Sequence, residues 1–557
     1  MRQFSGVWRR EAKFELATGG WVDCAAADGV QVVVLAHTSR SPDAHALLAE
    51  YRRAGSEGVR RRASDCGLLV CDQQSHTLML MRDAVGMTPI YYGTKRGDFA
   101  FGTRVTDVAQ FLSPFKLTPN RASLAALLVD HDAAPTDRSY FNDVHAVPPG
   151  HALIYRRGEV AWLSQVERAS AAPPASYEEA VAAFAASFRD AVRVRLDSAR
   201  PNALLLSGGL DSAAIACVAR EFGEVIGISY GPQDGSAADE SRYLDMLRAH
   251  GVRIERVPFY PTIDMTAVEA SVRAGETPAF DAVPLTLQRA ADAARALSAR
   301  NLLLGTWGDQ VLAPFPPPHH AALPPRRSNA LRELAHAYQA YMSDVPVTDI
   351  RRALTRQSLR RHAPSWLLAQ RRKRRRRKSV FDTLAHEFAP SQVVRERRSY
   401  ADALYENVYA PAQTEAIAGT TKWGYAHGVE VPLPFLDWPL LQLLATFPSD
   451  YAYHEHTLKP LLRSAMRGIV PRELLDRRDK GDYTAAIARG ALANRIVLER
   501  LEDLSRLVQH GLLSRTAARK TLARLHASSE IALGADELAM ILLGLDTWLR
   551  LFCENPL

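Results

Sequence analysis

The sequence predicts two domains of different class: an α+β domain, followed by an α/β domain with a parallel sheet and a large helical portion. Three observations support this prediction. Up to about residue 165, short apolar runs are separated by polar turns, a pattern typical of β-strands. From about residue 200, strand-like and helix-like segments alternate over short loops. Beyond about residue 325, the pattern is mainly helical.

Six segments of the first domain have the apolar pattern of strands. They are Val30 to Ala36, Gly67 to Asp72, Thr77 to Met81, Ile90 to Tyr92, Phe99 to Gly102 and His151 to Tyr155. The Ala- and Pro-rich stretch Ala171 to Ala175 is predicted to be a linker, which gives domains at 1–168 and 176–557. After the linker, Ser176 and Glu179 form a capping box that opens an amphipathic helix to about Arg195.

Strands and helices then alternate in the second domain. Strands are predicted at Ala203 to Leu206, Val225 to Tyr230, Val252 to Pro258 and Asn301 to Leu304, and helices at Asp211 to Phe222, Asp239 to His250 and Pro284 to Ser298. This alternation predicts a parallel sheet with helices on both faces. Ligands of such sheets bind at the carboxyl ends of the strands, so the loops there are the first place to look for a site.

Length and composition are those of a folded protein with more than one domain. Of 557 residues, 47% are hydrophobic and 23% charged. There is no apolar run of about 18 residues that would indicate a membrane span, and the chain starts with mixed charges rather than the apolar core of a secretory signal. The five cysteines are scattered and odd in number, which indicates reduced thiols. We therefore expect a cytoplasmic protein without a membrane partner.

Much of the net charge of +8 comes from one basic run, Arg371 to Lys378. Such a run is typical of a solvated, self-repelling loop. The alternative is a surface for an anionic partner, either nucleic acid or an acidic protein. No helix-turn-helix, zinc-finger or aromatic-interleaved basic pattern accompanies the run, so the sequence argues against a nucleic-acid partner.

The loop after the first strand of the second domain, Ser207 to Ser212, reads Ser-Gly-Gly-Leu-Asp-Ser. Its glycines let the backbone approach an anion closely, and N–H groups at a helix N-terminus bind phosphate oxygens. Asp211 suits a phosphate site if Mg²⁺ bridges the two. The alternative is a glycine turn in which Asp211 caps the helix. A Walker A loop is excluded, because the Gly-Lys-Ser/Thr ending is missing.

This segment resembles the SGGxDS pyrophosphate loop of the N-type ATP pyrophosphatases, which transfer AMP from ATP to a carboxyl or carbonyl oxygen. Further segments resemble, in the same order, motifs of the asparagine synthetase superfamily. They are Leu304 to Asp309 (S-G-E-G-x-D-E), Gly428 to Asp437 (GVE-x-R-x-PFLD, with Pro432 in place of arginine), Lys459 to Arg463 (K-x-x-L-R) and Pro471 to Gly481 (P-x-x-[IV]-x-x-R-x-K-x-G). Asp239 and Glu240 resemble an acidic pair of that family, and Asp437 is expected to cap the next helix.

The resemblance implies an adenine-nucleotide α-hydrolase-like domain that binds ATP and Mg²⁺. The implied nucleotide- and pyrophosphate-binding residues are Leu206, Ser207, Gly208, Gly209, Asp211, Ser212, Ser229, Leu304 and Gly305. Asp211 and Asp309 would bind Mg²⁺. Lys459 and Lys480 would neutralise charge that develops in the transition state, and Lys480 would also stabilise the tetrahedral oxyanion. A lone lysine is usually solvated, but the four ordered motifs favour a catalytic role for these two.

The first domain resembles glutamine amidotransferase domains. Arg82 to Tyr92 is similar to their R-D-x-x-G-x-x-P-L-Y-Y hairpin, and Val147 to His151 to their closing P-P-G-H. The resemblance implies an Ntn-hydrolase-like αββα sandwich. Active class II members carry a nucleophilic cysteine directly after Met1, whereas this chain has Arg2 and no cysteine before Cys24. We therefore predict a degenerate domain without glutaminase activity, as in β-lactam synthetases and lasso-peptide cyclases.

A second departure is Thr306, where asparagine synthetases carry glutamate and β-lactam-forming members tyrosine. Threonine is too weak a base to deprotonate an amine, and Glu415 is the candidate for the partner carboxylate. An α-amine has a pKa near 8 and needs little help to react. Together the departures suggest a lasso-peptide cyclase (macrolactam synthetase). It would adenylate an Asp or Glu side chain of a linear precursor peptide, and the peptide's own N-terminal amine would close the ring.

A leader peptidase or leader-binding protein of the same pathway would be a further partner of such a cyclase. The proline-rich Ala313 to Pro318 and the basic run are candidate surfaces for peptide or partner, with plain loops as the alternative. Two other classes of function stay open. One is a β-lactam synthetase-like enzyme or an ammonia-dependent asparagine synthetase, and the other is a non-catalytic scaffold.

Overall fold

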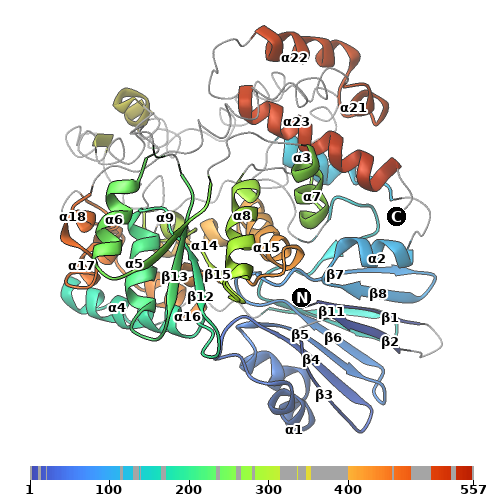
Figure 1. The fold of residues 1–557 in the computed structure, drawn as a ribbon. Helices are drawn as coiled ribbons and strands as arrows, with labels where there is room; N and C mark the ends of the chain where they lie inside the picture. Colours follow the sequence, from blue (N-terminus) through green and yellow to red (C-terminus); the bar gives the residue numbers. More distant parts are fainter. Residues whose placement is uncertain are drawn as a thin grey trace.

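Two lobes make up the computed structural model (Figure 1), one with two stacked sheets and one with a smaller parallel sheet. It describes residues 3–9, 14–19, 22–112, 117–129, 137, 139–164, 171–231, 233, 239–258, 265–278, 283–313, 335–336, 346–352, 355, 399–454, 457–477, 504–527 and 535–554. The basic run, the prolines at 314–318, Arg2 and Lys480 lie outside the described residues. None of the described helices is both long and apolar enough to cross a membrane.

The first lobe contains two antiparallel sheets. One has the order β2-β1-β8-β7-β9 and the other β11-β10-β6-β5-β4-β3. The strands of the first are β1 (Gln3–Trp8), β2 (Phe14–Gly19), β7 (Tyr91–Lys95), β8 (Asp98–Gly102) and β9 (His145–Ala146). Those of the second are β3 (Asp23–Ala27), β4 (Val30–Ala36), β5 (Cys66–Asp72), β6 (Thr77–Met81), β10 (His151–Arg156) and β11 (Glu159–Ser164).

Four layers result from the packing of these sheets. An apolar layer that includes Phe4, Leu80 and Phe101 fills the space between them. Helix α1 (Ala44–Arg62) covers the outer face of one sheet, and α2 (Val105–Leu112) covers that of the other. The predicted αββα sandwich is therefore confirmed, and so are all six predicted strands. Sequence analysis did not identify β1, β2, β3, β9 and β11. The side chains of β3 and β11 are largely exposed and give no apolar run.

The hairpin motif of the first lobe is explained by two buried charges. The guanidinium of Arg82 donates to the carbonyl oxygens of Gly86 at 2.7 Å and Val147 at 3.1 Å. The carboxylate of Asp83 accepts from the backbone N–H groups of Met87 at 2.9 Å and Thr88 at 2.6 Å. Buried backbone groups need such partners, so Arg82 and Asp83 hold the turn of this motif in shape.

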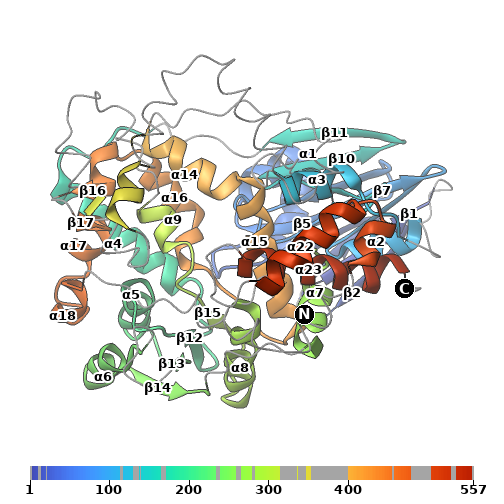
Figure 2. The same cartoon turned by 90° about the horizontal axis from the view of Figure 1, so that it is seen from above.

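The second lobe contains four parallel strands in the order β14-β13-β12-β15. They are β12 (Asn202–Leu205), β13 (Val225–Ser229), β14 (Arg253–Arg256) and β15 (Leu302–Leu303). Helices α5 (Leu210–Ala219) and α6 (Ser241–Ala249) lie on one side, and α8 (Val283–Ala296) lies on the other (Figures 1 and 2). The predicted parallel sheet with two helical faces is therefore confirmed. Ahead of it, the hydroxyl of Ser176 caps α4 (Tyr177–Arg193), whereas Glu179 accepts from Ala175 N–H.

The rest of the described chain is helical apart from a short hairpin. The helices are α7 (Met265–Gly275), α9 (Gly308–Leu312), α14 (Tyr400–Tyr409), α15 (Pro411–Ala426), α16 (Trp438–Ala445), α17 (Pro460–Ala465), α18 (Arg472–Leu475), α21 (Ser505–Gln509), α22 (Arg515–Ala527) and α23 (Ala535–Leu549). The hairpin pairs β16 (Tyr453–His454) with β17 (Thr457–Leu458). In both cartoon views, α15 lies between the two lobes (Figures 1 and 2).

The C-terminal helix joins the two lobes. Trp548 of α23 stacks on Phe141 of the first lobe with ring centroids 4.8 Å apart. Apolar residues of α2, α7 and α23 belong to the same buried cluster. The first lobe therefore shares a core with the second, and it is not a loosely tethered appendage.

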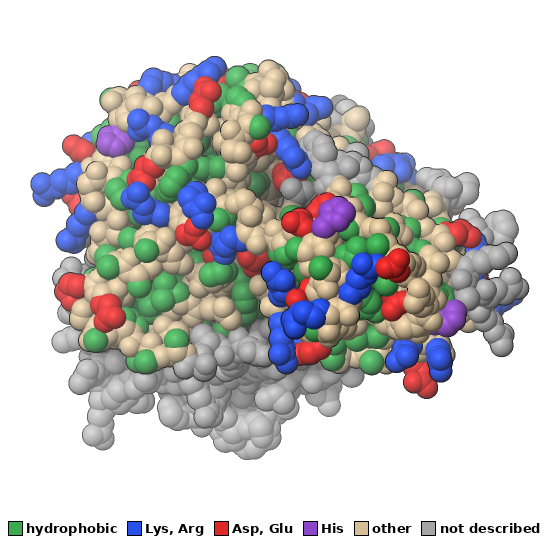
Figure 3. Space-filling model, turned by 90° about the horizontal axis from the view of Figure 1, so that it is seen from below, with side chains coloured by type: hydrophobic (Ala, Val, Ile, Leu, Met, Phe, Trp, Pro, Cys, Tyr) green, Lys and Arg blue, Asp and Glu red, His purple; other side chains and the backbone are tan. Residues whose placement is uncertain are grey.

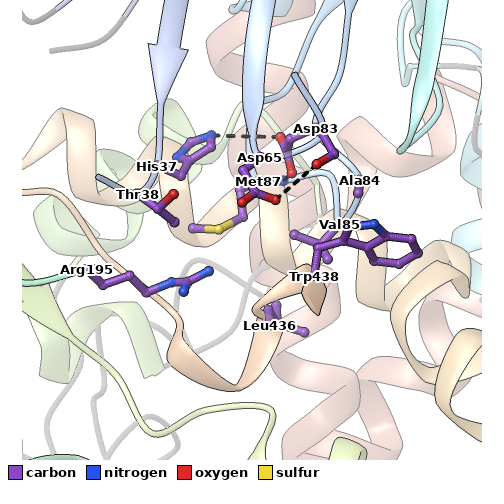
Figure 4. Close-up of a pocket in the computed structure, with 11 residues that line it drawn as sticks. His37, Thr38, Asp65, Asp83, Ala84, Val85, Met87, Arg195, Leu436 and Trp438 are labelled. Carbon is purple, nitrogen blue, oxygen red and sulfur yellow. Dashed lines mark hydrogen bonds and ion pairs between the residues drawn. The ribbon is translucent and has the colours of Figure 1, made fainter. Parts of the chain in front are cut away.

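Asp437 forms a second link between the lobes. Its carboxylate caps α16 at Leu440 N–H (3.2 Å), as predicted, but it also accepts from Arg195 at 2.7 Å and from Arg40 of the first lobe at 2.6 Å. Figure 4 shows the adjoining interface, where Asp83 is paired with His37 of the first lobe and Arg195 of the second lobe lines the same small cavity. Burial raises the pKa of Asp65, and so does the nearby Asp437. The cavity there is about 10 Å³, enough for a water molecule but not for a larger ligand.

Charged side chains are mixed on the face of the molecule shown in Figure 3. Acidic and basic residues alternate there, and no broad surface of one sign covers the described part of this face. A non-specific nucleic-acid surface needs a basic patch. This face does not supply one from its described residues.

Candidate active site

The glycine loop lies between β12 and α5, at the carboxyl edge of the parallel sheet. Gly208 has a φ of +76°, which favours glycine, and Gly209 is the N-cap of α5. The hydroxyl of Ser207 accepts from Gly209 N–H at 3.3 Å, and that of Ser212 donates to Gly209 O at 3.1 Å. No side chain caps the helix, so the interpretation of Asp211 as a cap is wrong. The loop instead presents a helix N-terminus, which attracts anions.

A second loop meets the first from the neighbouring strand. After β15, Trp307 takes the left-handed conformation with φ +68°, and Asp309 lies in the first turn of α9. The loops touch because glycines leave room. A Cβ on Gly308 would lie 2.6 Å from Asp211 Cγ, and one on Gly305 would lie 3.0 Å from Ser212 N. The two aspartates are thereby brought to one place, as their positions after parallel neighbouring strands predict.

Lys459 lies between the two carboxylates. Its ammonium is 2.5 Å from Asp211 Oδ2 and also forms an ion pair with Asp309 Oδ1. The lysine is 2% exposed and has a left-handed φ of +56° at the N-cap of α17. Burial alone would lower its pKa, but attraction to Asp211 and Asp309 outweighs burial and the pKa is raised. Lys459 is therefore charged at neutral pH and is aimed at the shared centre of the site.

This arrangement fits a magnesium–nucleotide site. The carboxylates of Asp211 and Asp309 are close enough to contact the same ammonium, that of Lys459. They could therefore supply two of the oxygen ligands that Mg²⁺ prefers. In the described part of the chain, no third Asp, Glu, His or Cys completes a metal cluster with them. Phosphate oxygens of a nucleotide would have to supply the remaining ligands, and the N-terminus of α5 lies beside the carboxylates to hold them.

A buried ion pair under the loop was not identified from the sequence. The guanidinium of Arg477 donates to Gly208 O at 3.1 Å and to the two carboxylate oxygens of Glu240 at 2.7 and 2.5 Å. It also lies over the ring of Tyr243, 3.8 Å from the centroid. The pair fixes the glycine loop and ties it to the segment that leads to Lys480. Glu240 was noticed as one of an acidic pair, but its partner is 237 positions away, and no local pattern indicates that.

The other predicted nucleotide-binding residues lie along the same edge. Leu206 and Leu304 directly follow β12 and β15, and Ser229 ends β13. The structure thus brings together the ends of three neighbouring strands. Thr306 is exposed in the second loop. The roles assigned to these residues stay predictions, as does the role of Lys480, which lies outside the described residues.

Glu415, the candidate for the partner carboxylate, already has two hydroxyl partners. It lies in α15, and its two carboxylate oxygens accept hydrogen bonds from the hydroxyls of Tyr140 and Thr277. Tyr140 belongs to the first lobe; burial, followed by the adjacent Glu415 charge, raises its pKa well above the usual value. The start of α15 reaches the second loop, where Trp307 Nε1 donates to Gln413 Oε1 at 3.1 Å. The carboxylate of Glu415 is thus oriented by the lobe interface.

The family is decided by comparison with known proteins. A model of the asparagine synthase family matches residues 183–550, more than half of the chain. This chain belongs to the asparagine synthase family. A model of the glutamine amidotransferase domain matches residues 32–166, which covers most of the first lobe. Both matches agree with the fold classes predicted from the motifs.

Relatives of this asparagine synthase family member are distant. Asparagine synthetase [glutamine-hydrolyzing] 1 of Bacillus subtilis is 21% identical over 453 residues, or 79% of this chain and 70% of that protein. Amidase chyE of Penicillium rubens and amidase chry2 of Gibberella zeae are each 25% identical and align with 56% and 54% of this chain. The chain spans about half the length of these two amidases, 47% and 46%.

Among solved structures, the resemblance to the fold is weak. Glutamine phosphoribosylpyrophosphate amidotransferase from B. subtilis covers 55% of this chain and 75% of its own, at 8% identity and a TM-score of 0.21. A score this low supports no inference. The family assignment therefore rests on the two family models.

Proposed function

We propose that this protein is an ATP-dependent amide ligase that first adenylates a carboxylate and then closes an amide bond on it. The observation that carries the proposal is that the carboxylates of Asp211 and Asp309 both contact the ammonium of Lys459, beside the N-terminus of α5. Such a site suits a nucleotide with Mg²⁺ on its phosphates. Family membership agrees with this chemistry.

Each residue of the candidate active site has a proposed role in this reaction. Asp211 and Asp309 would hold Mg²⁺, which neutralises phosphate charge when bound. The backbone and hydroxyls of Ser207 to Ser212 would hold the pyrophosphate, and Arg477 keeps that loop in shape through Gly208 O. Lys459 carries a fixed positive charge into the same space. In a dry, preorganised site, such charges stabilise charge that develops as the α–β bond breaks.

The substrate is proposed to be a linear precursor peptide. The oxygen of an Asp or Glu side chain would displace pyrophosphate from ATP and give an acyl-adenylate. The peptide's N-terminal amine would then attack the acyl carbon, AMP would leave, and the ammonium would lose a proton. Two features support this choice: a first lobe with Arg2 where the nucleophilic cysteine stands in active amidotransferases, and Thr306 where related enzymes carry a stronger base or its partner.

One experiment separates the proposed cyclase from its alternatives. ATP–pyrophosphate exchange is measured with the purified protein and Mg²⁺, using aspartate plus ammonia in one arm and linear peptides with an internal Asp or Glu in the other. We expect exchange only in the arm that contains a peptide. In that arm the product should be lighter than the linear peptide by the mass of one water molecule. An N-acetylated peptide should support exchange without ring closure, because it has no free amine. Asp211→Asn and Asp309→Asn should abolish exchange.

Other outcomes would favour the alternatives. Asparagine formed from aspartate and ammonia would identify an ammonia-dependent asparagine synthetase, a possibility supported by the alignment with the B. subtilis enzyme. Exchange with a β-amino acid substrate would indicate a β-lactam synthetase-like enzyme. Absence of exchange with every carboxylate would refute the ligase and favour a binding protein.

A further inference from the structure

A second cavity lies between the lobes, away from the aspartates of the candidate active site. Its volume is about 340 Å³, within the range of small-molecule sites, which is roughly 300–1,000 Å³. The first lobe contributes Gln3, Thr88, Thr103 and Arg104 to the walls, and the second contributes Arg273 and Lys422. The proposed ligase chemistry does not account for this cavity, and the hairpin motif contributes only Thr88 and Pro89 to its walls.

Its walls carry an excess of positive charge. Arg104, Arg273 and Lys422 line it, and none of the described lining residues is acidic. Two carboxylates that do not line the cavity, Glu276 and Asp107, interact with these cations. Glu276 attracts Lys422 at 3.1 Å and Arg104 at 3.4 Å, and the charge of Arg104 acts on Asp107. Three positive charges against two negative ones leave the cavity net positive.

The buried carboxylate is already engaged. Glu276 is 2% exposed and accepts from the backbone N–H groups of Val105 at 3.0 Å and Thr106 at 3.1 Å, in addition to its two cations. Opposite charges hold its pKa below the ordinary value although burial opposes this, so it is ionised at neutral pH. Glu276 therefore holds the side chains of Lys422 and Arg104 in place but forms no ion pair with Arg273.

Arg273 is the side chain without a partner. It lies exposed in the last turn of α7 and forms no ion pair with any residue that the structure describes. A guanidinium presents a planar fork of N–H donors that matches carboxylate and phosphate oxygens. The hydroxyl groups of two other lining residues, Thr88 and Thr103, are already bonded to His37 and to the carbonyl oxygen of Phe4, so recognition of a ligand would depend on the three cations.

We propose that this cavity binds a small organic anion, through a carboxylate or phosphate group held by Arg273, Arg104 and Lys422. Because the walls come from both lobes, the bound anion would bridge them. A ligand that binds only the assembled lobes stabilises the folded protein by mass action. The cavity would thus be a ligand site distinct from the nucleotide site, and its occupancy does not depend on the proposed ligase activity.

The test compares two arginines in matched positions. Arg273 and Arg248 both lie exposed in the last turn of a helix, α7 and α6, but only Arg273 lines the cavity. Arg273→Glu and Arg248→Glu therefore share the cost of an acidic residue at a helix C-terminus, and Arg248→Glu also removes the exposed ion pair of Arg248 with Asp245. Citrate and inorganic phosphate are the probes, each titrated calorimetrically into the full-length protein and also followed by thermal unfolding.

We expect saturable binding of at least one probe and a rise in Tm with its concentration. Arg273→Glu should weaken that binding at least tenfold and remove the rise in Tm, whereas Arg248→Glu should leave both unchanged. Comparison of the affinities for citrate and for phosphate shows whether the cavity prefers a carboxylate or a phosphate group. Circular dichroism checks that both variants are folded, and Arg273→Lys should retain part of the affinity.

Two results would overturn the proposal. One is no saturable binding of either probe to the unaltered protein. The other is equal binding by the unaltered protein and Arg273→Glu, which would place the anion elsewhere, for instance on the glycine loop. Either result leaves the proposed ligase function untouched, because exchange activity is measured separately.

Discussion

Gly308→Ala is the sharpest probe of the candidate active site. Gly308 is the first residue of α9 and does not have a positive φ, so an alanine backbone fits at this position. The added Cβ, however, would lie 2.6 Å from Cγ of Asp211 and 2.6 Å from its Oδ2. Ordinary contact begins at 3.4 Å, so the carboxylate must move by about 0.8 Å. It cannot do so without changing its contact with Lys459.

The size of the effect follows from that displacement. A misplacement of about 1 Å at a reacting centre costs on the order of 100-fold in rate, which is about 2.7 kcal/mol of transition-state stabilisation. We therefore expect Gly308→Ala to lower the rate of ATP–pyrophosphate exchange about 100-fold.

A matched control is available in α15. A Cβ on Gly419 meets nothing within 4 Å, so Gly419→Ala adds the same methyl group to a helix without a clash. Exchange by that variant should equal that of the unaltered protein. If Gly308→Ala catalyses exchange at the rate of the unaltered protein, the position of the Asp211 carboxylate does not matter for the reaction. That result would contradict the assignment of Asp211 as a Mg²⁺ ligand.

Four further predictions concern other parts of the chain. Arg477→Met should destabilise the fold by about 3 kcal/mol in urea unfolding, because it leaves the buried Glu240 charge without its partner; addition of Glu240→Gln should restore part of the loss, and strict additivity would argue against the pair. Glu276→Gln tests pH dependence. Since the folded pKa of Glu276 is lowered, its contribution is fully present above the unfolded value near 4.5 and is lost as pH falls through the folded value. The difference in unfolding free energy between the unaltered protein and Glu276→Gln should be constant from about pH 5 to 7 and shrink below about pH 4.5; a difference that grows there would contradict the assignment. Arg2→Ala should leave product formation intact, and a large loss would mean that the first lobe takes part in chemistry. Lys480→Ala should impair ring closure at least as much as exchange, and unchanged product yield would remove Lys480 from the mechanism.

Local patterns predicted most of the regular structure. Val30 to Ala36 and Thr77 to Met81 match β4 and β6 residue for residue, because buried strands are continuous apolar runs. Exposed edge strands such as β11 have no such run and were not predicted. The meeting of Asp211 and Asp309 could also be predicted, since each follows a strand of one parallel sheet and carboxyl ends share an edge.

The sequence alone therefore determined the two fold classes, the order of the motifs and the family they resemble. Only the tertiary structure decided which charges meet: Lys459 between the two aspartates, Arg477 on Glu240, Arg40 and Arg195 on Asp437, and three cations around an interlobe cavity. Periodicity and turn chemistry act over a few residues and can be read along the chain. Ion pairs between residues hundreds of positions apart depend on how whole lobes pack, which no local pattern records.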